Sequence, residues 1–215
     1  MQTHTLIASD HGPVILWVMY PHKGDESERM AEAAKELKDK CTMVAIQVDA
    51  WNRDLSPWSS ELVDSSFAGD AAKTLNYIEE SVFMEQEILN IQNLPQRRVY
   101  IMGYSLAGLF ALWSMYQIDA FAGCATCSGS LWYPGFTEYV ESQPKLKDKK
   151  IYLSLGGKES RTPDKLMATV GDRTKSAYEF LKKDNRVIYE INSGGHFADS
   201  VKRLMKAVRW IVDNQ

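Results

Sequence analysis

The sequence predicts a single-domain α/β fold, residues 1–215, in which a mostly parallel central sheet carries helices on both faces. Short apolar segments alternate with amphipathic segments of helical period along the whole chain, and this alternation is typical of strand–helix–strand units. Residues 14–20 are apolar without polar alternation, as expected for a strand buried on both faces. The 215 residues contain no internal repeat or linker and suit one domain with a full core.

The period of the apolar residues predicts the elements of the N-terminal half. In chain order they are a short strand at residues 6–8, a strand at 14–20, a helix carrying Met30, Ala33, Ala34 and Leu37, a strand at 42–48, a turn-rich loop at 49–66, and a long helical region from Ala71 to near Pro95.

The C-terminal half continues the alternation. Its expected elements are a strand at 98–102, a helix at 106–116, a strand of small residues at 122–126, a loop at 128–135, a strand at 151–155, a helix at 165–181 with a weak point at Gly171, a strand at 187–191, and a last helix at 198–212. Ligands of such sheets bind at the carboxyl ends of the strands, so the loops that follow the strands are where chemistry is expected.

The composition excludes several classes of function. A net charge of −3 and a pI near 5.8 give no electrostatic footprint for nucleic acid. Three cysteines are too few for a disulfide framework and the N-terminus has no positively charged leader, so we expect a cytoplasmic protein. Residues 99–118 lack charged side chains over a membrane-spanning length. A turn at Gly103–Ser105 favours a buried strand followed by a buried helix there, and we expect no membrane span.

The strongest chemical signal is the segment Gly103-Tyr104-Ser105-Leu106-Ala107-Gly108, between an apolar strand and an apolar helix. That context is typical of a nucleophile elbow, a sharp turn that exposes a serine hydroxyl at the end of the sheet. We therefore predict Ser105 as a nucleophile and the backbone N–H of Leu106 as one oxyanion donor. Ala107 replaces the second glycine of the usual pattern, and the added methyl group weakens the match more than the geometry.

A serine nucleophile needs a base, and four histidines are available. Of these, only His196 lies in a loop between the last predicted strand and the last predicted helix, and Gly194 and Gly195 let that loop turn over the end of the sheet. His196 is therefore the predicted general base.

The third residue is expected to be a carboxylate that lies between the serine and the histidine in chain order. Glu159 is the first acid after the strand at 151–155 and is the predicted choice. Asp164 is the second choice, because it lies further along the same loop. Asp199 follows the histidine and is out of order.

The second oxyanion donor is expected from the loop after residues 14–20. Pro21 has no N–H, which leaves Tyr20 or His22, and His22 is the predicted donor. Aromatic and basic side chains in other loops after strands are candidates to wall a substrate pocket, although tryptophans beside prolines also anchor loops. These candidates are Trp51, Arg53, Trp58, Trp132 and Tyr133.

Redox, metal and nucleotide chemistry find little support. Cys124 and Cys127 have the spacing of a redox pair, but they end a predicted strand instead of opening a helix, which favours two core thiols. The sequence has no H-E-x-x-H, no zinc ligand cluster, no G-x-G-x-x-G after a strand and no P-loop. We expect no metal and no cofactor.

Five segments carry a family resemblance, namely WNRDLSPW, GYSLAGLFALW, SGSLWYPG, SLGGKE and NSGGHF. With them the chain resembles, over nearly its whole length, the esterase branch of the α/β-hydrolases that includes S-formylglutathione hydrolase and the enterochelin-type siderophore esterases. The resemblance implies an α/β-hydrolase fold without a lid domain and a cytosolic esterase. The chain departs from the family at Ala107 and in lacking the His-Gly pair that often opens the oxyanion loop.

These observations predict a serine hydrolase, a carboxylesterase that acts on small acyl esters through Ser105, His196, Glu159 and an acyl-enzyme. A thioesterase or acyltransferase with the same residues is the first alternative, and a non-catalytic binding module on the same fold is the second. The expected partner is a small-molecule ester. The sequence does not define the oligomeric state.

Overall fold

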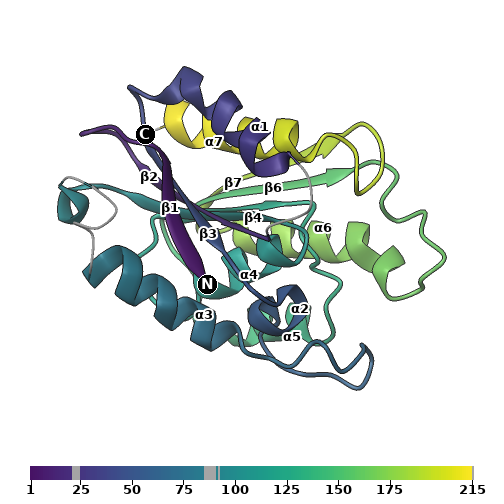
Figure 1. The fold of residues 1–215 in the computed structure, drawn as a ribbon. Coiled ribbons are helices and arrows are strands. Elements are labelled where there is room, and N and C mark those ends of the chain that lie inside the picture. Colours follow the sequence, from purple (N-terminus) through teal and green to yellow (C-terminus); the bar gives the residue numbers. More distant parts are fainter. Residues whose placement is uncertain (21–24, 85–90, 92, 215) are drawn as a thin grey trace.

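The computed structural model describes residues 1–20, 25–84, 91 and 93–214, which form a seven-stranded sheet covered by helices (Figure 1). The strands are β1 (Gln2–Ile7), β2 (Val14–Met19), β3 (Thr42–Gln47), β4 (Val99–Tyr104), β5 (Gly123–Cys127), β6 (Lys150–Gly156) and β7 (Arg186–Asn192). The α-helices are α1 (Glu26–Ala34), α2 (Trp51–Leu55), α3 (Ala71–Ile78), α4 (Leu106–Ser114), α5 (Phe136–Ser142), α6 (Val170–Leu181) and α7 (Ser200–Asp213). The remaining helical turns are 3-10 segments at Lys35–Leu37, Leu94–Gln96 and Met167–Thr169 and a π-helical turn at Glu79–Met84.

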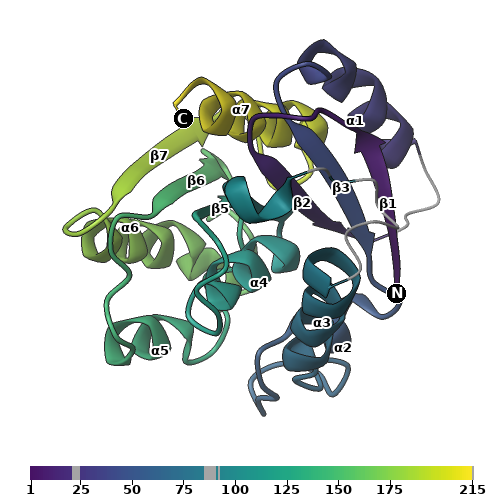
Figure 2. The same ribbon diagram turned by 90° about the vertical axis from the view of Figure 1, so that its left-hand side faces the viewer.

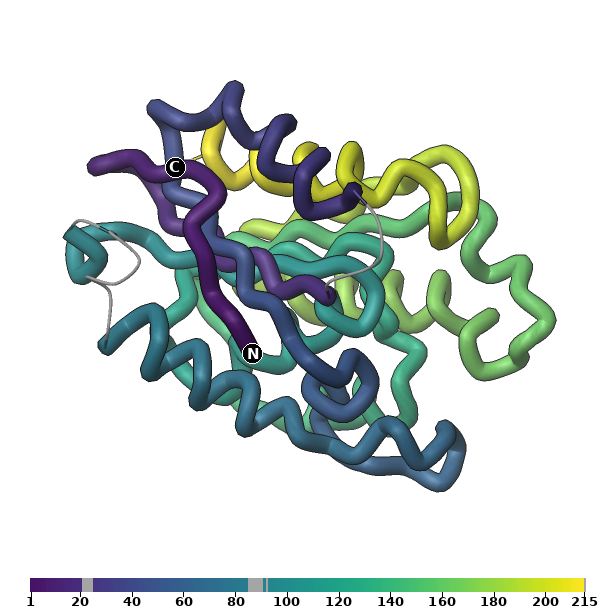
Figure 3. Tube along the Cα trace, in the orientation of Figure 1, coloured from purple at the N-terminus to yellow at the C-terminus, as the bar shows by residue number. Residues whose placement is uncertain are grey.

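The strands lie in the order β1-β3-β2-β4-β5-β6-β7. All neighbouring pairs from β3 to β7 are parallel, and β1 pairs antiparallel with β3 at one edge, where the traces of the two strands run side by side (Figure 3). From β2 the chain goes to β3 on one side and then crosses to β4 on the other. The order therefore reverses between β2 and β4, and the carboxyl end of that pair is the place where sheets of this type bind ligands.

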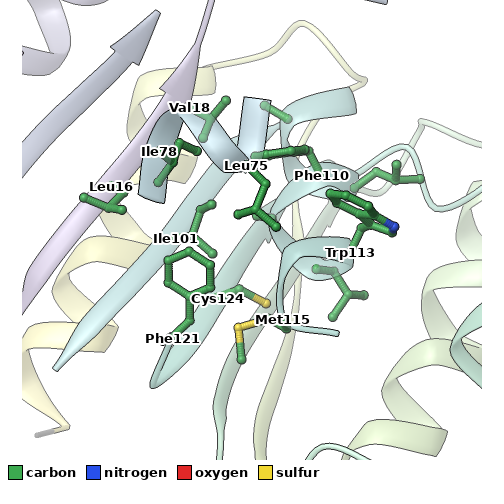
Figure 4. Close-up of a cluster of buried hydrophobic side chains, with 14 of the residues drawn as sticks. Leu16, Val18, Leu75, Ile78, Ile101, Phe110, Trp113, Met115, Phe121 and Cys124 are labelled. Atoms are coloured by element: carbon green, nitrogen blue, oxygen red, sulfur yellow. The ribbon is translucent and has the colours of Figure 1, made fainter. Parts of the chain in front are cut away.

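Alternate residues of each buried strand contribute to two hydrophobic layers, one on each face of the sheet. Leu16 and Val18 of β2 pack with residues of α3 and α4, whereas Ile15 and Trp17 pack with residues of α1 and α7. Figure 2 shows α1 and α7 together on one face and the remaining helices on the other. Figure 4 shows part of the larger layer, in which Leu75 of α3 lies between Ile78 of the same helix and Phe110 of α4. The prediction of a mostly parallel sheet with helices on both faces is confirmed.

Individual boundaries differ from the sequence prediction. The short strand expected at residues 6–8 is the end of β1, whose exposed and half-buried residues alternate because it is an edge strand. The loop expected at 49–66 contains α2, and α5 was not predicted. The helix expected at 165–181 begins as a 3-10 turn and becomes α-helical at Val170. The long helical region expected from Ala71 runs partly outside the described residues.

Residues 99–118, which have the length of a membrane span, form β4, the whole of α4 and the turns around them. In the part of the chain that the structure describes, no helix is both long and apolar enough to cross a membrane.

Candidate active site

Ser105 occupies a sharp turn between β4 and α4. Its backbone has φ 56° and ψ −123°, a conformation that residues other than glycine rarely adopt and that the surrounding structure must impose. Its N–H donates to the carbonyl of Cys127, 3.0 Å away, which ties the turn to β5. The turn is possible because Gly103 has no side chain: a Cβ there would lie 2.4 Å from the carbonyl carbon of Ala107. The result is a serine side chain at the carboxyl end of the sheet, at the switch point between β2 and β4.

Two hydrogen bonds link Ser105, His196 and Glu159. Nε2 of His196 lies 3.0 Å from Oγ of Ser105, and Nδ1 of the same ring lies 2.8 Å from Oε2 of Glu159. A carboxylate can only accept a hydrogen bond, so Nδ1 carries a proton, and in the neutral imidazole the lone pair is then on Nε2 and faces the serine hydroxyl. The imidazole is therefore held in the tautomer that can accept a proton from Ser105.

Glu159 is buried, with a side-chain exposure of 3%. Burial alone would raise the pKa of this carboxyl, but hydrogen bonds from His196, from the N–H of Gly156 and from the hydroxyl of Ser128 outweigh it. The pKa of Glu159 is consequently lower than its ordinary value. The acid is thus held as a carboxylate beside the imidazole.

A buried arginine on α7 connects the parts of the site. Nη1 of Arg203 lies 3.0 Å from Oε1 of Glu159, and it also donates to the hydroxyls of Tyr104 and Ser128 at 2.9 and 2.8 Å. Nη2 donates to the carbonyls of Ser193 and Gly195 in the histidine loop, at 2.8 and 2.9 Å. One guanidinium therefore holds the acid, the end of β4 and the loop that carries the base.

Two serines after β5 lie beside the nucleophile. Ser128, which has φ 48°, donates its hydroxyl to Glu159, 2.7 Å away. Ser130 places its Oγ 3.4 Å from Oγ of Ser105, and its N–H donates to the carbonyl of Ser105 at 3.0 Å. The loop after β5 therefore supports both the acid and the elbow.

Ser105 and His196 lie where two cavities meet. The first has a volume of about 520 Å³ and the second about 360 Å³, and Trp51, Ser105, His196 and Phe197 line both. The first cavity is also lined by Asn52, Phe67, Leu106, Ser128, Ser130, Trp132, Lys158, Glu159, Arg161, Thr162, Met167 and Val170. The second is also lined by Trp17, Val18, Met19, Tyr20, Glu26, Tyr104 and Ser200. A volume of several hundred Å³ suits a small organic ligand.

Two of the four aromatic residues predicted for the pocket, Trp51 and Trp132, line the first cavity. The other two, Trp58 and Tyr133, anchor a loop. Trp58 donates its indole N–H to the carbonyl of Pro134 at 2.9 Å, and Tyr133 donates its hydroxyl to the carbonyl of Trp58 at 2.6 Å. These two side chains line neither cavity.

Arg53 also lines neither cavity, because its guanidinium is paired with carboxylates of its own neighbourhood. Its Nε lies 2.8 Å from Oδ1 of Asp54 and 3.9 Å from Oδ2 of Asp70. The structure therefore does not bring Arg53 to the other predicted site residues.

The predicted oxyanion donors are only partly described. Leu106 is the first residue of α4, so its backbone N–H has no acceptor within the helix, and Leu106 lines the first cavity. His22, the other predicted donor, lies outside the described residues. Tyr20, the alternative, lines the second cavity and packs edge-on against Trp51 with ring centroids 6.1 Å apart.

The second-choice acid has a different role in the structure. Oδ1 of Asp164 accepts the backbone N–H groups of Leu166 and Met167, both at 2.9 Å, and thereby caps the 3-10 turn that precedes α6. Asp164 is exposed. Glu159, and not Asp164, is the acid that contacts His196.

Comparisons with known proteins agree with this architecture. An IroE-like serine hydrolase from Shewanella oneidensis matches with a TM-score of 0.75 at 17% identity, over 95% of this chain and 71% of that one. The siderophore hydrolase EstB from Aspergillus nidulans matches with a TM-score of 0.68 at 17% identity, over 96% of this chain and 84% of that one. The chain has the α/β-hydrolase fold. No family model matches it.

At the level of sequence, the chain is similar to the uncharacterized protein YbbA of Bacillus subtilis (strain 168). The two are 22% identical over 196 residues, which cover 85% of this chain and 78% of YbbA.

Sequence reasoning missed several residues of this candidate site. Arg203 gave no signal because a charged residue in an amphipathic helix is normally exposed, whereas here its side chain is only 2% exposed. Ser128 and Ser130 lie in a predicted loop after a strand, and that position could have marked them as candidates. Lys158 and Arg161 flank the predicted acid, and the same position could have marked these two as well.

The three cysteines lie in the core. Cys124 and Cys127 are buried, and burial raises the pKa of the Cys127 thiol to about 12. Cys124 has its pKa raised by burial as well. Among the described residues no three His, Cys, Asp or Glu side chains are grouped so as to hold a metal ion.

Proposed function

We propose that this protein is a serine hydrolase that cleaves carboxylic esters of small acyl groups, with Ser105 as nucleophile, His196 as general base and Glu159 as the orienting acid. The observation that carries the proposal is the continuous hydrogen-bond chain from Oγ of Ser105 through both ring nitrogens of His196 to Glu159, with distances of 3.0 and 2.8 Å. That chain ends in a cavity large enough for a small ligand.

The first chemical step follows from the orientation of the imidazole. The hydroxyl oxygen of Ser105 attacks the ester carbonyl carbon while its proton passes to Nε2 of His196. The carbonyl oxygen becomes an oxyanion, which the N–H of Leu106 and a second donor from the segment after β2 stabilise. The oxyanion then re-forms the carbonyl, the C–O bond to the alcohol breaks, and the imidazolium donates its proton to the leaving oxygen.

The second step returns the enzyme to its starting state. Water attacks the acyl-enzyme and gives a proton to Nε2 of His196, and the carboxylic acid leaves as Ser105 takes that proton back. Glu159 stabilises the imidazolium in both steps without itself being protonated, which agrees with a pKa below its ordinary value. This route needs no cofactor.

The structural neighbours support the reaction class through what their names state. One is a serine hydrolase and another hydrolyses siderophores, and both match most of this chain. A ferulic acid esterase also matches, with a TM-score of 0.64 at 14% identity. Esters of small or aromatic acids are accordingly the first substrates to test.

The decisive experiment compares wild type with Ser105→Ala. We expect a fluorophosphonate to label wild type on Ser105 alone, and a screen of short-chain and aromatic esters to show turnover that falls by roughly 10³-fold or more in the variant. Folded wild type that is neither labelled nor active would instead indicate a binding module. Competing thiol and alcohol nucleophiles in the same assay, and matched thioesters, distinguish an esterase from an acyltransferase or a thioesterase.

A further inference from the structure

The first cavity has an uneven distribution of charge. Lys158 and Arg161 line it, both are exposed, and neither forms an ion pair with any residue that the structure describes. The acid among its described lining residues is Glu159, whose carboxylate is buried and already bonded to His196 and Arg203. The cavity therefore presents two cations to a ligand and no accessible anion from its described lining.

Apolar side chains also line the first cavity. Trp51, Phe67 and Trp132 line it, and so do two apolar side chains that are exposed to solvent: Phe197 is 95% exposed and Met167 is 40% exposed. Aromatic and thioether side chains stabilise a bound ligand by covering its apolar part. A ligand that fits this cavity has an apolar body and an anionic end.

The second cavity has the opposite character. Its described lining residues include the carboxylate of Glu26 and no lysine or arginine. One oxygen of Glu26 accepts a hydrogen bond from the hydroxyl of Ser200, 2.5 Å away. An anionic group placed there would face a like charge, so the charge distribution assigns an anion to the first cavity.

We infer that the substrate is an ester carrying a carboxylate or a similar anion on the group that occupies the first cavity, where Lys158 and Arg161 bind it. This inference rests on the proposed function and specifies its substrate class. Arginine binds a carboxylate through two parallel N–H donors, and lysine adds a point charge. Because both cations are exposed, salt weakens the attraction.

The test uses two matched pairs of esters. In one pair the anion is on the acyl side: the 4-nitrophenyl monoester of glutaric acid is compared with 4-nitrophenyl pentanoate. In the other it is on the alcohol side: 4-carboxyphenyl acetate is compared with its methyl ester. The measured quantity is the ratio of kcat/KM between the charged and the neutral member of a pair. A substitution that only reduces the amount of folded enzyme or the power of the catalytic residues lowers both values alike, so it leaves this ratio unchanged.

We expect wild type to prefer the charged member of at least one pair by about tenfold at low salt, as two exposed ion pairs allow. The preference should disappear in the double variant Lys158→Gln/Arg161→Gln and should decline in wild type as NaCl is raised. Lys40→Gln/Lys175→Gln, which removes two exposed charges elsewhere, is the matched control and should retain the preference.

Two results would overturn the inference in distinguishable ways. Ser105-dependent turnover with no charge preference in either pair, or a preference that survives in Lys158→Gln/Arg161→Gln, would contradict the anionic substrate and leave the proposed function standing. Absence of Ser105-dependent turnover of all four esters would contradict the proposed function, and the inference with it.

Discussion

Arg203 and Glu159 form a buried ion pair, with Nη1 3.0 Å from Oε1 and side-chain exposures of 2% and 3%. Removing one member of such a pair leaves an uncompensated charge in a low-dielectric environment, which is far more costly than losing a surface pair. The same guanidinium also holds two carbonyls of the histidine loop. Arg203 is therefore placed to fix the distance between the acid and the base.

The first prediction is that Arg203→Met destabilises the fold and impairs catalysis. We expect the free energy of unfolding to fall by about 3–5 kcal/mol, because the variant leaves Glu159 buried without its cation. Urea unfolding measures this loss. Arg209→Met is the matched control on the same helix: Arg209 pairs with Glu36 at 2.7 Å but is 46% exposed, so its loss should cost about 1 kcal/mol or less.

The pH dependence of kcat/KM distinguishes two roles of Arg203. In one it positions the imidazole of His196, and in the other it only stabilises the fold. Without the cation, the negative charge of Glu159 acts more strongly on His196 and favours its protonated form. We expect the acidic limb of kcat/KM to move to higher pH in folded Arg203→Met, and Arg203→Lys to restore part of the wild-type profile. An unchanged limb in a folded, active Arg203→Met would show that Arg203 serves stability alone.

The second prediction concerns the acid. Glu159→Gln should lower kcat by up to ~10⁴-fold, because a neutral amide cannot stabilise the imidazolium and can hold the ring in the wrong tautomer. Steady-state kinetics on the best ester from the screen measures the effect. Asp164→Asn is the control, since Asp164 caps a 3-10 turn and makes no contact with the imidazole. Equal losses in the two variants would remove Glu159 from the proposed mechanism.

The third prediction is a dependence of stability on pH. The pKa of Glu159 is lower in the folded protein than its ordinary value, and an unfolded glutamate titrates near ~4.3. The stability that this carboxylate contributes is therefore complete above that pH and is lost as the pH falls through the folded-state value. The free-energy difference between wild type and Glu159→Gln, from urea unfolding, should shrink between about pH 6 and about pH 3. A difference that is independent of pH would contradict this.

The arrangement of the fold could be predicted from the sequence because buried parallel strands leave a strong signal. Residues 14–20 are apolar on both faces and residues 42–48 are so except at Thr42 and Gln47, and β2 and β3 lie within these two segments. Short elements were harder to predict. The five residues of α2 and the seven of α5 are too few to show a helical period, and tertiary contacts of residues such as Leu55 and Phe136 fix them.

The site could be predicted only where chain order constrains it. Ser105, Glu159 and His196 follow three different strands. The elbow motif, the order of the residues along the chain and the rule that ligands meet the carboxyl ends of strands together selected residues that the structure places in contact. Trp58 also lies in a loop after a strand, but two hydrogen bonds and ring contacts with residues 75 or more positions further along the chain decide that it packs a loop. Arg203 depends entirely on such long-range contacts.

The last prediction tests the tight approach of strand and helix at the elbow. A Cβ at Gly103 would lie 2.4 Å from the carbonyl carbon and 2.5 Å from the Cβ of Ala107, closer than such atoms approach in proteins. Gly103→Ala must therefore displace the start of α4, and with it Ser105 and the N–H of Leu106. We expect a loss of about 1–3 kcal/mol in the free energy of unfolding and a larger relative loss of kcat.

Two companion variants make this prediction specific. Gly195→Ala adds the same methyl group where no atom lies within 4 Å, so its free energy of unfolding should stay close to that of wild type. Gly103→Ala/Ala107→Gly removes the contact between the two Cβ atoms and leaves the contacts with the Ala107 backbone at 2.4 and 2.5 Å, so it should recover only part of the stability. Wild-type stability and activity in Gly103→Ala would mean that helix and strand separate without cost, and the close approach would then not hold the elbow in place.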